Sequence, residues 1–322
     1  MLHRIDIKEI KGIRIGHAED TCGGTGCTVC IAPGGAPCGI DVRGGGPASR
    51  ETELLKPTAA AECVHAVILC GGSAFGLAAA DGVMKYLKER DIGFETAYGI
   101  VPLVAASSVF DLPCGDSTAY PDSSMGYKAA VASEMNDPRE GNFGAGTGAT
   151  VGKMHGAEFA MKSGQGICAL QHGDVQAGAL VVVNALGDVY DEKNTVLAGM
   201  RRADGGGFVD SSRCLAEEGL HVWDKNGAAA NTTIGFVVTN GIFTKTEMNK
   251  IAALASNGLA RSIRPVNTTA DGDSLYALST GGTKADLNQV GELAALAVEK
   301  AVRRAVLTAQ AAHGFAAALR DS

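Results

Sequence analysis

The sequence predicts a layered α/β fold, of the α+β kind in which helices cover sheets on both sides. Two observations carry this prediction. Apolar runs rich in β-branched residues alternate with stretches of helical apolar spacing, in the order β, α, β, β, α, β, α. Glycine is frequent, at 44 of 322 residues, and aromatic residues make up only 5%, as in layered proteins with many tight turns. No internal repeat of fixed period is evident, and we treat residues 1–322 as a single domain.

The first half of the chain is predicted to consist of short strands and one helix. Short β-type runs at 13–17 and 27–31 are punctuated by glycines at 34–35 and 44–46. A buried strand at 65–70 enters the glycine-rich turn GGSAFG, and apolar residues at helical spacing then predict a helix over 77–90.

The second half contains the strongest strand signals. They are the runs at 177–184 and 232–239, with shorter candidates at 188–191 and 275–278. An amphipathic helix is predicted over 245–262, and an Ala-rich helix over 287–319. The predicted apolar face of the first helix comprises Met248, Ile251, Leu254, Ala255 and Leu259. Residues 201–231 form a long polar segment without sustained period, which predicts a loop.

Charge and hydropathy exclude several classes of partner. The formal net charge is −7 and the pI is about 5.5, and no basic stripe indicates binding to nucleic acid. The pairs Arg201-Arg202 and Arg303-Arg304 are interpreted as solvated surface. No apolar run reaches the roughly 18 residues of a membrane span, so no membrane partner is expected.

The nine cysteines favour a reduced, cytoplasmic setting, because their number is odd and no secretory leader opens the chain. Cys27 and Cys30 have C-x-x-C spacing, but they lie in a strand-like run with period two. No second ligand pair follows at finger-like spacing, so two buried thiols are favoured over a metal or redox site.

Two glycine-rich segments resemble phosphate-binding loops. GGSAFG at 71–76 lacks the Lys-Ser/Thr of a P-loop and does not match G-x-G-x-x-G, so close helix-on-sheet packing explains its glycines as well. In GAGTGATVGK at 144–153 the spacing to Lys153 is wrong, and Met154 stands where Ser or Thr would follow. We therefore reject a nucleotide-hydrolase function, and we expect no cofactor and no metal.

The most informative motif is Asn231-Thr232, which joins the polar segment to a β-branched strand. Such a junction suits intramolecular cleavage, in which the Thr232 hydroxyl attacks the carbonyl before it and water opens the resulting ester. The new α-amine, with a reference pKa near 8, can then act as base for the same hydroxyl. Two other readings are open: N-x-Ser/Thr glycosylation at Asn231, which the cytoplasmic setting disfavours, and a Thr that merely opens a strand.

Four polar residues are candidates to join Thr232. Asp271 and Asp273 could hold an ammonium group or the Thr hydroxyl, although Asp-Gly is also an ordinary turn pair. Asn184 ends an apolar strand, where its carboxamide could donate to a developing oxyanion or cap a turn. Lys153 follows several glycines and could approach a buried hydroxyl, although most lysines are solvated.

Taken together, ordered blocks along nearly the whole chain give a resemblance to a known family. The chain resembles the self-processing DmpA-type D-aminopeptidases, β-peptidyl aminopeptidases and nylon-oligomer hydrolases. The blocks are GIRIGHAED, DVRGGGPASRETELL, CGGSAFGLAAADGVMKYL, GAGTGATVGK, NTTIGFVVTN and RPVNTTADGDSLYALSTGG.

The resemblance implies a single catalytic domain that cleaves itself into an α chain 1–231 and a β chain 232–322. It further implies an αββα sandwich resembling N-terminal-nucleophile hydrolases and ornithine acetyltransferases, and a homotetramer of αβ units. Thr232 matches the nucleophile, and Thr in place of Ser here places the chain nearer the nylon-hydrolase branch. The implied substrates are small peptides or amides; α-, β- or D-amino-acid peptides and 6-aminohexanoate oligomers all require the same chemistry.

The resemblance also assigns roles to the other candidates. Asn184 matches an oxyanion-side Asn, and Asp271 and Asp273 match residues that orient the nucleophile. Lys153 matches a lysine beside it, and Tyr120 lies in a Tyr-Pro-Asp segment that could touch substrate.

Two alternatives stay open. The first is an ornithine-type acetyltransferase, whose cleavage site usually reads Ala-Thr-Met-Leu and is not matched here. The second is a non-catalytic module that binds a small ligand and remains a single chain.

Overall fold

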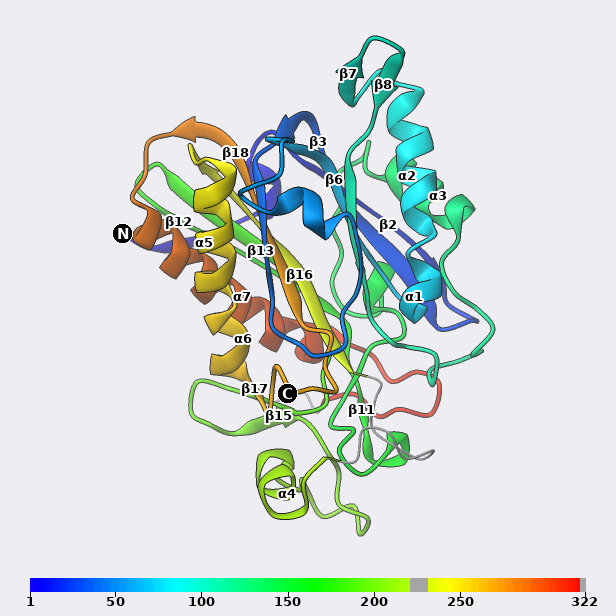
Figure 1. Cartoon of the computed structure of the whole chain (residues 1–322). Helices are drawn as coiled ribbons and strands as arrows, with labels where there is room; N and C mark the ends of the chain where they lie inside the picture. Colours follow the sequence, from blue (N-terminus) through cyan, green and yellow to red (C-terminus); the bar gives the residue numbers. More distant parts are fainter. Residues whose placement is uncertain (221–230, 319–322) are drawn as a thin grey trace.

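Two β-sheets lie face to face in the computed structural model, with helices on their outer faces (Figure 1). The structure describes residues 1–220 and 231–318. The predicted layered fold is confirmed. One apolar core fills the space between the sheets, and a further core lies between each sheet and its helices.

The first sheet contains the longest strands and the residues of the candidate site. Its six described strands run in the order β1, β12, β13, β16, β18 and β4, and all neighbours are antiparallel except the parallel pair β16–β18. Their bounds are His3–Ile5, Gln165–His172, Val175–Asn184, Thr232–Gly241, Ser274–Thr283 and Cys38–Val42. The predicted strands at 177–184 and 232–239 are therefore central neighbours.

The second sheet has five described strands in the order β2, β3, β6, β9 and β5, with β6 and β9 parallel. Their bounds are Arg14–Asp20, Thr25–Ala36, Val64–Cys70, Val104–Ser108 and Ala48–Arg50. Cys27 and Cys30 are buried free thiols on β3, as expected. However, residues 25–32 are buried on both faces, so this strand does not alternate between core and solvent.

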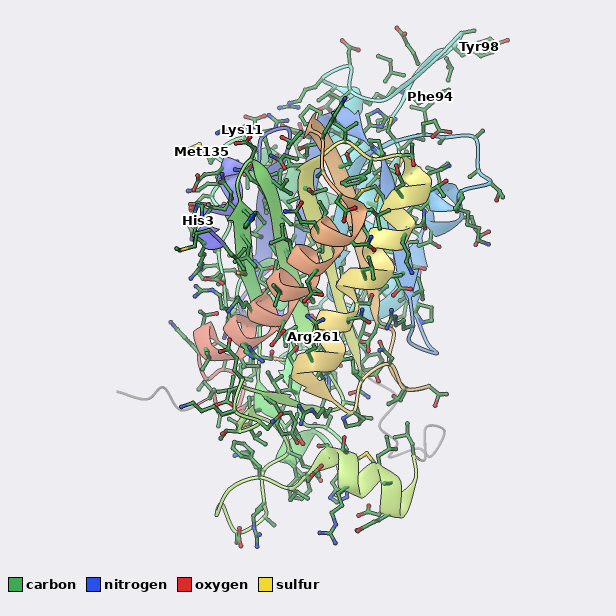
Figure 2. All side chains as sticks on the ribbon, turned by 90° about the vertical axis from the view of Figure 1, so that its left-hand side faces the viewer. His3, Lys11, Phe94, Tyr98, Met135 and Arg261 are labelled. Carbon is green, nitrogen blue, oxygen red and sulfur yellow. The ribbon has the colours of Figure 1, made fainter. Side chains whose placement is uncertain are left out.

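The helices form the two outer layers. α5 (Lys245–Ala255), α6 (Asn257–Ser262) and α7 (Leu287–Thr308) cover the first sheet, as Figure 2 shows. α2 (Ala79–Lys88) and α3 (Ser123–Ala132) cover the second. The remaining described helices are α1 (Ser73–Gly76) and α4 (Ser211–Glu218), and the short 3-10 turns span Ile7–Glu9, Thr52–Leu55, Gly144–Gly146 and Ala157–Phe159.

Three small sheets complete the described fold. β10 (Thr150–Val151) pairs with β11 (Met161–Lys162), and β14 (Asp188–Tyr190) lies between β15 (Val196–Ala198) and β17 (Ile263–Arg264). β7 (Phe94–Thr96) and β8 (Gly99–Val101) form a hairpin that projects from the body, with Phe94 and Tyr98 exposed (Figure 2).

The predicted helix over 245–262 is wrong in one respect, because the structure divides it into α5 and α6. The hydroxyl of Ser256 bonds to the carbonyl of Ala252 at 3.1 Å, a contact that bends helices. Beyond the break, a Cβ on Gly258 would lie 2.8 Å from Cβ of Val298, so the glycine lets α6 pack closely on α7.

The C-terminal helix ends at Thr308 and not near residue 319. Ala309 leaves the helix with extended backbone, and the chain turns back to pair with β11, where Lys162 N donates to the carbonyl of Ala316 at 2.8 Å. Tertiary pairing thus overrides the helix propensity of the Ala-rich tail.

The segment 201–231 is not all loop, because it contains α4. The Asp210 carboxylate caps this helix by accepting from Arg213 N at 2.9 Å. The expected loop over 221–230 lies outside the described residues.

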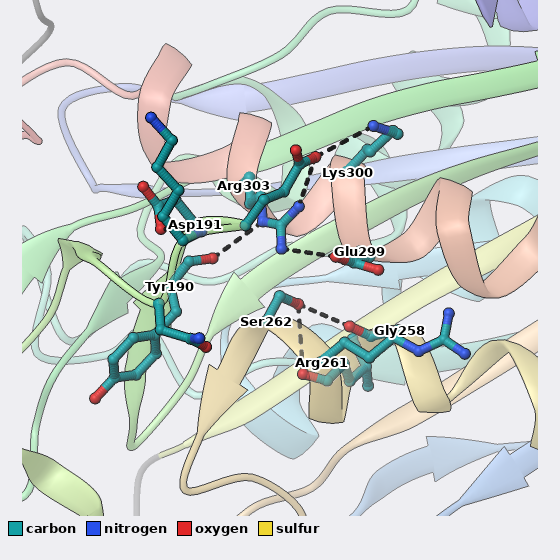
Figure 3. Close-up of polar contacts among 12 residues, drawn as sticks. Tyr190, Asp191, Gly258, Arg261, Ser262, Glu299, Lys300 and Arg303 are labelled. Carbon is teal, nitrogen blue, oxygen red and sulfur yellow. Dashed lines mark hydrogen bonds and ion pairs between the residues drawn. The ribbon is translucent and has the colours of Figure 1, made fainter. Parts of the chain in front are cut away.

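The interpretation of the C-terminal arginine pair as solvated surface is wrong. Arg303 is buried, and its guanidinium donates to the Tyr190 carbonyl at 3.0 Å and to Glu299 at 2.6 Å (Figure 3). Arg304 is half-buried, and its Nε donates to Glu140 at 2.6 Å. Both side chains therefore join α7 to the rest of the fold.

Across residues 1–220 and 231–318, no helix combines the length and the apolar character needed to cross a bilayer.

Candidate active site

The Asn231-Thr232 peptide is anchored on both sides at the start of β16. Thr232 is paired with Asn184, the last residue of β13, and Asn231 forms a parallel bridge with Asp271. Asn231 and Thr232 are only 3% and 4% exposed. The cleavage point predicted from the sequence therefore lies at the beginning of a central strand, where both flanking residues are held by backbone pairing.

Two hydrogen-bond donors converge on the carbonyl oxygen of Asn231. The Thr232 hydroxyl donates to it in a short contact, and Gly272 N donates to it at 3.0 Å. The hydroxyl that would attack this carbonyl is thus already beside it, and a backbone N–H points at the oxygen that would become negative. Such donors lower the barrier when they are fixed before the charge develops.

A cavity of about 210 Å³ opens beside this peptide. Small residues dominate its wall. The lining residues are Gly45, Gly46, Ala48, Ser73, Ser108, Phe110, Asn231, Thr232, Thr269 and Ala270.

The Asp271-Gly272-Asp273 turn holds the backbone around Thr232. Asp273 accepts from Thr233 N at 2.5 Å and from Asn267 N at 2.9 Å. Asp271 accepts from the backbone and hydroxyl of Thr268 at 2.8 and 2.6 Å. The Asp273 carboxylate thus bonds to the residue after Thr232, whereas the Asp271 carboxylate bonds within its own turn, so the turn interpretation and the site interpretation of this pair are compatible.

The glycines of DVRGGGP pack against this turn, and the contacts there explain why the residues are glycines. Gly44 N donates to the Asp273 carbonyl at 3.2 Å, and Gly46 N donates to the Asp271 carbonyl at 2.9 Å. A Cβ on Gly44 would overlap the backbone of residues 271–273. Only glycine permits this close approach, and the next two glycines, Gly45 and Gly46, line the cavity.

Lys153 and Asn184 are joined by direct hydrogen bonds. The Lys153 ammonium donates to the backbone carbonyl and to the side-chain oxygen of Asn184, at 2.9 Å each. Thr150 N donates to the same side-chain oxygen at 3.0 Å, and the Asn184 amide donates to the Phe110 carbonyl at 3.0 Å. Asn184 is therefore fixed from several directions opposite Thr232.

Burial dominates the electrostatics of the site. It lowers the pKa of Lys153 to about 7, against the opposing influence of Asp271, Asp111 and Asp273. Burial also raises the pKa of Asp271 and of Asp273, and the charge of Asp271 adds to the rise at Asp273. A lysine that loses its proton near neutral pH can accept a proton from a hydroxyl.

Tyr120 lies apart from these residues. The residue is 44% exposed, and its ring stacks on Phe75 with a centroid separation of 5.0 Å. It does not line the cavity, although its Cβ closely approaches the position of a Cβ on Gly72, next to the lining residue Ser73.

The sequence analysis missed Asp111, which is 2% exposed and bonds to Gly72, the residue before the lining residue Ser73. It accepts from Gly72 N at 2.6 Å and from the Thr25 hydroxyl at 2.8 Å. Burial raises its pKa to about 6, and its charge favours the protonated form of Lys153. The available signal was GGSAFG, in which the Gly72 N–H binds a carboxylate of the chain itself and not a phosphate.

Comparisons with known proteins identify the family of the chain. The model of peptidase family S58 matches residues 6–319. An uncharacterised aminopeptidase of Mycobacterium leprae is 36% identical, over 96% of this chain and 92% of its own. A 6-aminohexanoate-oligomer endohydrolase of an Agromyces species is 32% identical, over 84% of this chain and 74% of its own.

Solved structures show the same fold. The L-aminopeptidase D-Ala-esterase/amidase of Ochrobactrum anthropi, a variant of the N-terminal-nucleophile hydrolase fold, superposes with a TM-score of 0.73. It covers 98% of this chain and 90% of its own at 17% identity. A β-aminopeptidase of a Burkholderia species gives a TM-score of 0.69, covering 97% of this chain and 90% of its own, also at 17% identity. The chain therefore belongs to peptidase family S58, and it is a hydrolase of amide and peptide bonds built on the N-terminal-nucleophile hydrolase fold.

Proposed function

We propose that this hydrolase cleaves its own Asn231-Thr232 bond and then uses the new N-terminal Thr232 as nucleophile on small peptides or amides. The observation that carries the proposal is the contact of the Thr232 hydroxyl with the carbonyl of the residue before it, at the start of a central strand.

In the precursor, Thr232 Oγ attacks the carbonyl carbon of Asn231. The carbonyl oxygen becomes negative and is stabilised by Gly272 N–H. Lys153, whose pKa is lowered to about 7, accepts the Thr232 hydroxyl proton in its neutral form. The C–N bond then breaks and its nitrogen takes the proton, which leaves Asn231 as an ester on Oγ. The Thr232 amine is free from this point, and water then hydrolyses the ester to give a carboxylate at Asn231 and the free Thr232 hydroxyl.

In turnover, the substrate carbonyl occupies the position of the Asn231 carbonyl. The α-amine of Thr232 accepts the hydroxyl proton as Oγ attacks, and passes it to the leaving amine of the substrate. Asn184 is fixed on the neighbouring strand, where its amide is proposed to assist the oxyanion. Water then opens the acyl-enzyme. The small-residue cavity favours substrates with a small acyl group, and the relatives named aminopeptidase and 6-aminohexanoate-oligomer endohydrolase support peptide and amide substrates.

Intact-mass spectrometry of purified wild type, Thr232→Ala and Thr232→Ser tests the proposal. We expect wild type to separate into chains 1–231 and 232–322 under denaturing conditions. Thr232→Ala should remain one chain without amidase activity, and Thr232→Ser should retain part of both functions. Full amidase activity in uncleaved Thr232→Ala would refute the mechanism, and acetyl transfer from N-acetylornithine in place of hydrolysis would favour the acetyltransferase alternative.

A further inference from the structure

Outside the candidate active site, three potential metal ligands meet beside α4 (Figure 1). They are His155, Cys214 and Glu218, and their ligand atoms all lie within 4.8 Å of one another. The imidazole Nε2 of His155 is 2.9 Å from a carboxylate oxygen of Glu218. Among the residues that the structure describes, no other group of three such side chains meets this criterion.

The fold brings the three side chains together from two separate segments. Cys214 and Glu218 are four residues apart on α4, so their side chains lie on the same face of the helix. His155 lies in the turn after Lys153, where Gly156 N donates to the Lys153 carbonyl at 3.0 Å. The cluster therefore joins α4 to the loop that carries Lys153.

α4 is held in this position by contacts that do not involve the cluster. The buried Asp188 carboxylate accepts from Ser211 N at 2.9 Å and from the Ser211 hydroxyl at 2.8 Å. Cys214 is buried, whereas the side chains of His155 and Glu218 are 38% and 52% exposed. Cys214 is thus held inside the protein, whereas His155 and Glu218 are accessible to an ion from solvent.

The donor set selects one class of ion. A thiolate, an imidazole and a carboxylate together are typical ligands of Zn²⁺, whereas Mg²⁺ and Ca²⁺ prefer oxygen ligands only. Tetrahedral zinc, with ligand distances of about 2.0–2.3 Å, places its ligand atoms roughly 3.3–3.7 Å apart, within reach of these side chains by small rotations.

We propose that His155, Cys214 and Glu218 bind one Zn²⁺ ion, with water in the fourth position. The ion would clamp α4, the last described element before residue 221, to the loop after Lys153. This proposal concerns a binding site separate from the hydrolytic reaction, and it stands whether or not the chain cleaves itself.

Cobalt titration tests the site, because Co²⁺ replaces Zn²⁺ at such sites and a Co²⁺–thiolate bond gives a near-ultraviolet charge-transfer band. Full-length protein is first freed of metal with a chelator. We expect the band to saturate at one equivalent of Co²⁺ and to disappear when one equivalent of Zn²⁺ displaces it. Absence of the band in the wild-type protein would overturn the proposal and leave the cluster as a hydrogen-bonded group.

Two ligand variants and one control test the ligand set. Cys214→Ser should lose the band, and the exposed His155→Gln, a change that the fold should tolerate, should need more than about tenfold more Co²⁺. Cys22→Ser is the matched control, since it removes an exposed thiol elsewhere and should titrate like wild type. A band that survives in Cys214→Ser, or that is unchanged in His155→Gln, would refute this ligand set. If Cys214→Ser does not fold, His155→Gln alone decides.

Discussion

At the scale of the residue, the carbonyl of Asn231 is the point on which the proposed chemistry converges. Its hydroxyl donor, Thr232, was predictable from the sequence because a β-branched strand follows a polar segment there. Its second donor, Gly272 N–H, was not predictable, because nearly every residue has a backbone N–H and the residue type does not show which one points at the site. Asp111 was missed for a related reason: the sequence showed a phosphate-like glycine loop, and only the fold shows that the chain fills it with its own carboxylate.

Gly272→Ala should slow self-cleavage strongly. A Cβ at this position would lie 2.8 Å from Oγ1 of Thr232 and 2.8 Å from the Gly46 carbonyl oxygen, so the nucleophile must move. A displacement of about 1 Å commonly costs on the order of 10²-fold in rate. The measurement is the rate at which the 232–322 fragment appears in intact-mass spectra of freshly expressed protein.

Gly34→Ala is the control for this change, because Gly34 is exposed and a Cβ there meets nothing within 4 Å. It should cleave at the wild-type rate. Cleavage of Gly272→Ala at that same rate would show that the position of Oγ at this turn does not limit the reaction.

The pH dependence of self-cleavage should report Lys153. Burial lowers the pKa of this lysine to about 7, so the side chain is protonated below that pH and becomes a neutral base above it. If Lys153 accepts the Thr232 proton, the cleavage rate rises between about pH 6 and 8 and then levels off. Rates measured from pH 5 to 9 on unprocessed protein test this expectation, with Lys153→Met slow throughout. A wild-type rate that falls over this range would contradict the assignment.

At the scale of the element, predictability depended on whether local pattern or tertiary contact decides the structure. The central strands β13 and β16 and the buried strand β6 follow apolar β-branched runs, and the sequence located them within a few residues. Helix ends were less predictable. The break between α5 and α6 combines a local contact, from the Ser256 hydroxyl to the Ala252 carbonyl, with the close approach of Gly258 to α7, and the end of α7 depends on pairing with β11; the approach and the pairing are not local in sequence.

The start of α5 offers a prediction that separates stability from chemistry. The Thr244 hydroxyl accepts from Glu247 N at 3.3 Å, while Thr244 N donates to the Glu247 carboxylate at 2.8 Å, which forms a capping box. Thr244→Ala should therefore lower the free energy of unfolding by about 1 kcal/mol, with self-cleavage unchanged. Urea denaturation checks the first effect and intact mass the second.

Lys250→Ala on the exposed side of the same helix is the matched control, and it should change the free energy of unfolding by less than about 0.5 kcal/mol. Equal destabilisation by the two variants would mean that the cap contributes nothing beyond helix propensity.

At the scale of the whole molecule, the proposed cleavage divides the chain but not the fold. Residues 232–322 supply β16, β18, α5, α6 and α7, whereas residues 1–231 supply the strands on either side, β13 and β4. β16 pairs with β13 along eight residue pairs, from Asn184↔Thr232 to Ala177↔Thr239. Both the core between the sheets and the core under α7 take side chains from both parts.

The two proposed chains should consequently remain together after cleavage and behave as one cooperative unit. Separating them would expose both faces of two central strands and leave their backbone hydrogen bonds unpaired, at a free-energy cost comparable to that of unfolding. Size-exclusion chromatography of cleaved protein should give one peak that contains both chains, and guanidinium should release them only across the transition that abolishes the native circular dichroism. Release of the 232–322 chain before that transition would show that the strand pairing of β13 with β16 and the shared cores do not hold the cleaved molecule together.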